Sequence, residues 1–187
     1  MLIREVTDVI ERFAPLAWQE SYDNAGLIVG RPDDEVHRAL LAVDVTDEVM
    51  AEAEREGCDM VITHHPIVFH ALKRFNSADQ VQRCVERAIR GGIALYACHT
   101  NLDSAPGGMS WRLAEMLGVG DLRVLQPAQA DEKVGFGVVG ELPEPMATVE
   151  FMRRMQRVLG VRVVRHSDIA SPEVRRVAVC TGADGPD

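Results

Sequence analysis

Three apolar runs that each end in polar residues constrain the fold of this chain most strongly. The runs are Arg38–Thr46, Cys58–His70 and Ile93–Asp103. A helix is expected in each of the two intervals, because glycines that commonly end helices stand at Gly57 and at Gly91–Gly92. Strands that alternate with helices predict a mostly parallel sheet with helices on its faces, and therefore an α/β fold.

Capping residues mark where these two helices should begin. Thr46 can cap the first helix, with Asp47 and Glu48 in the first turn, where the helix dipole favours acidic side chains. Ser77 and Gln80 have the spacing of a capping box before the second helix. Each helix therefore has a predicted start as well as a predicted end.

The character of the chain changes near residue 126, which divides it into two expected units. Residues 1–125 are interpreted as a metal-binding α/β unit, and residues 126–187 as a smaller, incomplete α/β unit. In the second unit the β-branched runs VRVVRH and VRRVAVC predict strands, and an amphipathic segment with Thr148 as its cap predicts a helix. We therefore expect two α/β units with mixed sheets flanked by helices, the first mostly parallel.

Composition excludes several classes of protein. The net charge of −9 argues against a nucleic-acid-binding face, which needs clustered Lys and Arg. The four cysteines form no C-x-x-C pair, so we interpret them as small buried hydrophobic residues rather than zinc ligands. The N-terminus is charged throughout and no apolar run approaches the length of a membrane span, so a cytoplasmic location without membrane contact is expected.

Adjacent histidines at the end of the second run indicate where the chemistry lies. His64 and His65 follow the apolar residues 60–62, and Pro66 stops the strand. Side chains alternate between faces inside a strand, but this rule lapses at the strand end, so both imidazoles can reach one crevice. His99 and Asp103 close the next run, and the carboxyl ends of parallel strands meet at one edge of the sheet. Imidazole and carboxylate groups that converge in this way predict a divalent metal site.

Other interpretations of these residues stay open. His64 and His65 could instead satisfy backbone groups at a strand end, and Asp44 could be a turn residue that leads into a helix. His70 could line the pocket or face solvent. His99 could hold Asp103 or a bound water in position rather than contact the metal itself.

Three blocks of the sequence together resemble one family. The blocks YDNAGLIVG, THHPIVFHALKRF and HTNLDSAPGGMSWRLAEMLGV are similar to the signature segments of the NIF-three-like dinuclear-metal-centre hexameric proteins, often called GTP cyclohydrolase I type 2. The resemblance implies two α/β domains per subunit, a homohexameric ring, and a site for up to two divalent ions per subunit. Zinc, iron, manganese, cobalt and nickel would each suit these donors.

The resemblance also assigns residues to this site. Its metal ligands correspond to His64, His65 and Asp103, and the motif Tyr22-Asp23-Asn24 lies near the site. The family's remaining ligands are a histidine and a glutamate that follow the VAVC strand and a glycine-rich turn, whereas this chain ends at Asp187. We therefore expect a C-terminally shortened member with partial, exchangeable metal occupancy.

Three functions are compatible with this sequence. The first is a metal-dependent hydrolase that acts on a nucleotide-like or related small substrate, as the resemblance implies. The alternative is a non-enzymatic, metal-binding oligomeric scaffold or regulatory protein. A metallophosphoesterase of another fold has less support, because it would need more Asp and Asn ligands at strand ends than Asp44 and Asn101.

Overall fold

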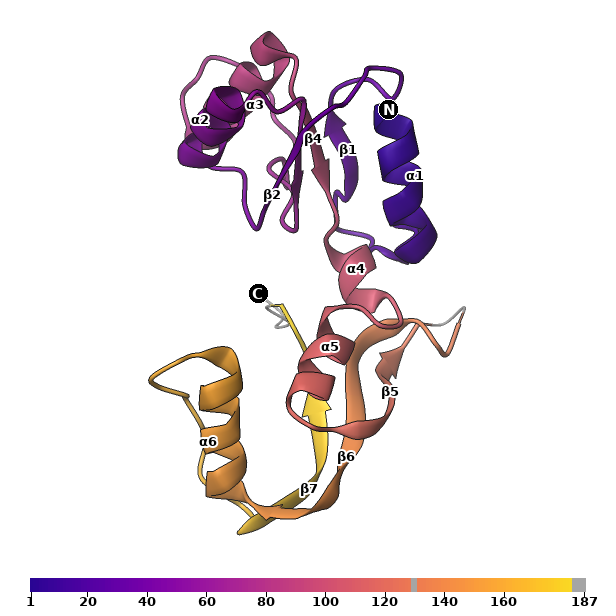
Figure 1. Ribbon diagram of the computed structural model, residues 1–187, viewed down its shortest axis with the longest axis vertical. Coiled ribbons are helices and arrows are strands. Elements are labelled where there is room, and N and C mark those ends of the chain that lie inside the picture. The colour runs from indigo at the N-terminus through magenta and orange to yellow at the C-terminus, as the bar shows by residue number, and fades with distance from the viewer. Residues whose placement is uncertain (129–130, 183–187) are drawn as a thin grey trace. The chain divides into compact units, whose positions relative to one another are not determined.

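The computed structural model describes residues 1–128 and 131–182, and it divides into two compact units (Figure 1). The first unit is Met1–Leu102 and the second begins at Asp103. The boundary expected between residues 125 and 126 falls inside a strand of the second unit. Ala114 of the helix before that strand and Leu117, directly after the helix, lie in the core of the second unit, so this segment belongs to it. Each unit is described by itself below.

A four-stranded sheet forms the centre of the first unit. Its strands are β1 (Gly26–Val29), β2 (Ala39–Ala42), β3 (Met60–Thr63) and β4 (Ala94–Ala97), in the order β1-β4-β3-β2. Strands β2, β3 and β4 are parallel, and β1 pairs antiparallel with β4. The predicted α/β class with a mostly parallel first sheet is therefore confirmed.

Helices cover both faces of this sheet, as Figure 1 shows. They are α1 (Ile3–Phe13), the 3-10 turn η1 (Leu16–Trp18), α2 (Asp47–Glu56) and α3 (Gln80–Gly91). Val61 pairs with Leu95 in the sheet, and both side chains belong to one buried core together with Met50 of α2 and Cys84 of α3. Burial of Val61, Leu95 and Met50 stabilises the unit by roughly 1.5–3 kcal/mol each. Because helices cover both faces of the sheet, side chains on both faces are apolar, which explains the continuous apolar runs.

The helix boundaries match the sequence signals in part. Thr46 caps α2, because its hydroxyl accepts a hydrogen bond from the N–H of Val49, and Gly57 ends that helix with a φ of 63°. The predicted capping box at Ser77 and Gln80 is wrong. Asp79 caps α3 instead, since its carboxylate accepts a hydrogen bond from the N–H of Gln82 at 2.8 Å.

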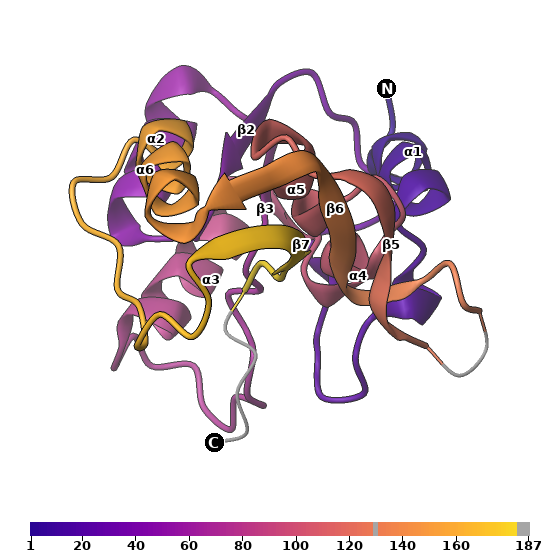
Figure 2. The same cartoon turned by 90° about the horizontal axis from the view of Figure 1, so that it is seen from below.

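The second unit is an antiparallel sheet with two helices packed on it. Its elements are α4 (Thr100–Ser104), which starts in the first unit, α5 (Met109–Met116), β5 (Gly120–Pro127), β6 (Gly135–Ala147), α6 (Thr148–Leu159) and β7 (Glu173–Val179). The sheet order is β5-β6-β7, and the three strands lie side by side in Figure 2. One core joins Leu117, Phe151 of α6, and Val138 and Val177 of the sheet.

Three local predictions for the second unit and the cysteines are wrong. Residues 161–166 form no strand, and Val163 is 77% exposed, because β-branched residues form strands only where a neighbouring edge and an apolar surface receive them. Thr148 does not cap α6; its hydroxyl donates to the carbonyl of Ser171 at 2.7 Å. Cys180 is exposed, whereas the other three cysteines are buried as expected.

The helices in the described part of the chain are all too short or too polar to cross a membrane.

Candidate metal centre

Three imidazoles come together where β3 and β4 end. His64 and His65 follow β3, and His99 follows β4. One ring nitrogen from each of the three histidines lies within 4.8 Å of the other two nitrogens. Among residues 1–128 and 131–182, no other group of three or more histidine, cysteine or acidic side chains could hold a metal ion in this way. Their ring centroids are 4.9 to 5.5 Å apart. The two strand ends therefore supply three nitrogen donors to one point.

The backbone at the end of β3 explains how two neighbouring histidines reach the same side. The last register pair of β3 and β4 is Thr63 with Ala97. The Thr63 hydroxyl then donates to the carbonyl of His65 at 2.8 Å, and the N–H of His65 donates to the carbonyl of Val43 at 3.0 Å. These two bonds bend the chain after Thr63, so the alternation of an extended strand no longer applies.

An oxygen atom holds the Nδ1 of each ring. Nδ1 of His64 lies 2.9 Å from the carbonyl oxygen of Cys98. Nδ1 of His65 lies 2.7 Å from Oδ1 of Asp44, and Nδ1 of His99 lies 2.8 Å from Oδ1 of Asp23. In a neutral imidazole these acceptors place the proton on Nδ1 and the lone pair on Nε2. This arrangement suits metal-binding histidines, whose other nitrogen commonly donates to a carboxylate or carbonyl.

Asp23 is the most strongly embedded of these acceptors. Its side chain is fully buried, and it accepts hydrogen bonds from the Thr100 hydroxyl, the His99 ring and the N–H groups of Asn24 and Thr100. Burial raises the pKa of Asp23, but these hydrogen bonds outweigh it and the pKa lies below the ordinary value. Asp23 therefore stays a carboxylate at neutral pH and fixes the orientation of His99.

Asp44 has a role that the sequence left open. The sequence also allows a turn residue that leads into α2 at this position, and the structure pairs the Asp44 carboxylate with His65. The carboxylate thus holds an imidazole, as Asp23 does for His99.

Asp103, the carboxylate expected among the ligands, lies in the second unit. It stands on α4 and is only 4% exposed. The hydroxyl of Thr181 donates to its Oδ1 at 3.3 Å, and Ser110 is 2.9 Å from that hydroxyl. Its position relative to the three imidazoles stays a prediction.

The phenyl ring of Phe69 lies beside His99 in the first unit. The rings of Tyr22 and Phe69 have centroids 6.3 Å apart, and the ring of Phe69 lies 6.3 Å from that of His99. His70 is exposed and its ring is 5.2 Å from that of Phe69. Sequence reasoning did not single out Phe69, although it stands inside the block that contains both His64 and His65.

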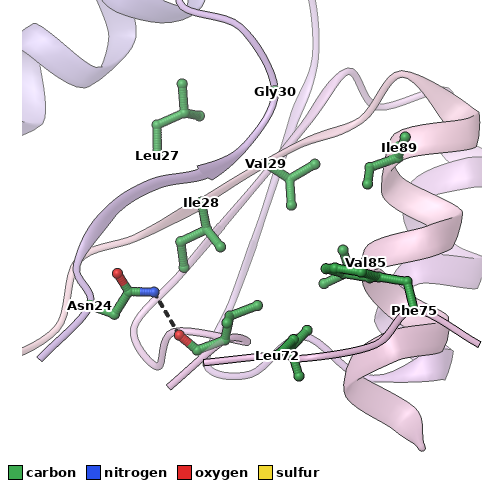
Figure 3. A pocket seen from close by; sticks show the side chains of 10 residues that line it. Asn24, Leu27, Ile28, Val29, Gly30, Leu72, Phe75, Val85 and Ile89 are labelled. Carbon is green, nitrogen blue, oxygen red and sulfur yellow. Dashed lines mark hydrogen bonds between the residues drawn. The ribbon is translucent and has the colours of Figure 1, made fainter. Parts of the chain in front are cut away.

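A separate cavity of about 530 Å³ lies between β1, α3 and the segment around residues 68–75, as Figure 3 shows. Its walls are largely apolar and include Leu27, Val29, Phe75 and Val85. At one end the side-chain amide of Asn24 donates to the carbonyl of Val68 at 2.6 Å. This bond ties the Tyr22-Asp23-Asn24 motif to the segment that follows the adjacent histidines.

The comparisons with known proteins agree with this architecture. A relative named "GTP cyclohydrolase 1 type 2 homolog" from Clostridium perfringens is 31% identical over 183 residues, which cover 98% of this chain and 70% of that relative. A protein of the same name from Streptomyces coelicolor is 35% identical, with 97% of this chain and 65% of that relative covered. The chain thus spans about two thirds of the length of these relatives.

The fold has solved counterparts. The crystal structure of a Bacillus cereus protein related to NIF3 matches with a TM-score of 0.89 at 23% identity, over 99% of this chain and 77% of that one. The family model for Duf34/NIF3 (NGG1p interacting factor 3) matches residues 1–185. This chain therefore belongs to the Duf34/NIF3 family.

Proposed function

We propose that this chain binds divalent metal at His64, His65 and His99, with Asp103 as a carboxylate ligand, and acts as a metal-dependent hydrolase on a nucleotide-like or related small substrate. The observation that carries the proposal is the convergence of three imidazoles whose Nδ1 atoms are all held by oxygen acceptors. Relatives named "GTP cyclohydrolase 1 type 2 homolog" support the choice of a nucleotide-like substrate.

The donor set fits a divalent transition metal. Imidazole nitrogen suits zinc, iron, cobalt and nickel, and an added carboxylate also suits manganese. His99 could have held Asp103 or a bound water in position instead of contacting the metal, but its ring nitrogen lies within 4.8 Å of those of His64 and His65. We therefore include it among the ligands, and up to two ions per subunit would need Asp103 and further donors.

The residues of the chain would have distinct tasks in hydrolysis. A bound divalent ion would supply Lewis acidity and lower the pKa of a water molecule. His64, His65 and His99 present nitrogen lone pairs at fixed positions, because Cys98, Asp44 and Asp23 hold their other nitrogens. The buried, negatively charged carboxylate of Asp23 also lies against Nδ1 of His99, which makes Nε2 of that imidazole a stronger electron-pair donor to a metal.

Nucleotide hydrolysis with controlled metal content tests the proposal. The purified chain is treated with EDTA, divided, and assayed with GTP and other nucleoside triphosphates after addition of each candidate metal. We expect hydrolysis only in samples that receive metal. Metal retention without hydrolysis across the substrate screen would instead favour the alternative, a non-enzymatic metal-binding scaffold.

Self-association is the second part of the proposal. β2 is an edge strand of its sheet. Leu41 in β2 is 74% exposed to solvent, and Val43, directly after the strand, is 61% exposed. Covering these side chains with a second copy would remove apolar surface from water. We propose a homo-oligomer, with the hexamer that the resemblance implies as the favoured state.

Light scattering at micromolar concentration tests the assembly. The unmodified chain is expected at a multiple of its 20.6 kDa mass, and Leu41→Lys should shift it toward smaller species. A monomeric unmodified chain would contradict the proposal.

A further inference from the structure

Two aromatic rings are exposed beside the histidine cluster. Tyr22 is 59% exposed and Phe69 is 41% exposed. The rings meet edge to face, with centroids 6.3 Å apart and an angle of 62° between their planes. Phe69 also lies 6.3 Å from His99. Burying a phenyl ring is favourable, so a pair left exposed at the rim of a candidate catalytic site calls for an occupant.

Hydrogen bonds fix the two segments that carry these rings. The amide of Asn24 donates to the carbonyl of Val68, which joins the residue two places after Tyr22 to the residue just before Phe69 (Figure 3). Asp23, between Tyr22 and Asn24, is anchored to His99 and Thr100. These bonds restrain the backbone beside each ring, which lowers the cost of ordering the two segments when a ligand binds.

We propose that Tyr22 and Phe69 form an aromatic wall that binds the planar ring of the substrate by stacking. This inference rests on the proposed function and narrows its substrate class to molecules that carry a flat aromatic or heteroaromatic ring. Stacking on aromatic side chains contributes about 1–3 kcal/mol per base and does not depend on which base is present. The wall therefore selects for flat rings, while the imidazole cluster lies beside it.

Binding of nucleosides without phosphate tests the wall separately from the metal chemistry. The probes are guanosine and adenosine, with ribose as the non-planar control. Ligand-observed NMR titrations are run on the full chain as purified and again in EDTA. Because these probes carry no phosphate, we expect both nucleosides to bind in EDTA as well, with ribose giving no saturable signal.

Substitutions locate the binding. Phe69→Leu and Tyr22→Leu should each weaken nucleoside binding about fivefold or more, the factor that corresponds to the lower end of the stacking energy. Phe75→Leu is the matched control, because Phe75 is also exposed but lines the apolar cavity instead. Thermal melting of each variant shows whether the fold is kept.

The outcomes separate this inference from the proposed function. Undetectable nucleoside binding, or equal losses in Phe69→Leu and Phe75→Leu, would overturn the aromatic wall and leave metal-dependent hydrolysis to its own test. Nucleoside binding that depends on Tyr22 and Phe69 in a chain without metal-dependent hydrolysis would support the wall and refute the hydrolase. If a second copy of the chain covers the two rings instead, dilution would separate the copies and raise the affinity for nucleosides. That result would also overturn the inference.

Discussion

Oδ1 of Asp23 lies 2.8 Å from Nδ1 of His99, although the two residues are 76 positions apart in the chain. The contact joins the turn before β1 to the segment after β4, which are neighbours because β1 pairs antiparallel with β4. It orients one of the three imidazoles of the candidate metal centre. The loop before β1 thus serves the site without itself supplying a proposed metal ligand.

Replacing this carboxylate should weaken metal binding without removing a ligand. In Asp23→Asn the amide can donate to Nδ1 of His99, which favours the tautomer with the proton on Nε2. We expect metal affinity to fall about 10- to 100-fold, as is typical when a group that orients a ligand is lost. Competition titrations with a chromophoric chelator measure the change.

Asp59→Asn is the matched control for that experiment. Asp59 also pairs with a histidine, His37, but lies outside the candidate centre. Its replacement should leave metal affinity unchanged. Equal affinities in Asp23→Asn and the unmodified chain would mean that the orientation of His99 does not matter for binding.

Asp59 leads to a separate prediction about pH. Its carboxylate accepts hydrogen bonds from the N–H groups of His37 and Arg38, and these bonds hold its pKa below the ordinary value of 3.8. A depressed pKa in the folded state stabilises the fold at pH values above 3.8, and this stabilisation is lost as the pH falls through the folded-state pKa. The difference in unfolding free energy between the unmodified chain and Asp59→Asn should therefore shrink between pH 5 and pH 3. Urea titrations at several pH values measure it, and a difference that grows on acidification would refute the assignment.

The start of α3 offers a test of local stability. Asp79→Ala removes the acceptor for the N–H of Gln82 and should destabilise the first unit by about 1 kcal/mol. Asp79→Asn should be nearly neutral, because asparagine caps helices about as well as aspartate. Chemical denaturation compares the two, and equal losses would show that charge rather than capping is what matters.

The sequence predicted the parts of the fold that depend on local patterns. The apolar run before His64 and the glycine that ends α2 required only neighbouring residues, and both were interpreted correctly. The strand predicted at residues 161–166 is wrong, because a strand needs an available sheet edge to pair with, and β-branched residues alone cannot supply one. The predicted cap of α3 is wrong because Ser77 and Asp79 both have the residue type and spacing of a helix cap. Only the backbone geometry selects Asp79.

The candidate site shows the same limit. The strand-end positions of His64 and His65 could be predicted because an apolar run precedes them and Pro66 follows them directly. The pairing of Asp23 with His99 depends on how β1 packs beside β4, so no local signal reveals it. Phe69 joins the site through a loop whose course depends on the Asn24–Val68 hydrogen bond, another contact between distant residues.

The metal content of a double histidine variant tests the central claim most directly. His64→Ala combined with His65→Ala should bind no metal when each protein is dialysed to equilibrium against the same buffer containing the divalent ion, while His37→Ala, which changes an exposed histidine outside the cluster, should bind as much as the unmodified chain. Elemental analysis gives ions per chain, and circular dichroism checks that the fold survives. Loss of bound metal in the double variant alone is the predicted result; equal metal retention in the double variant and the unmodified chain would contradict the account.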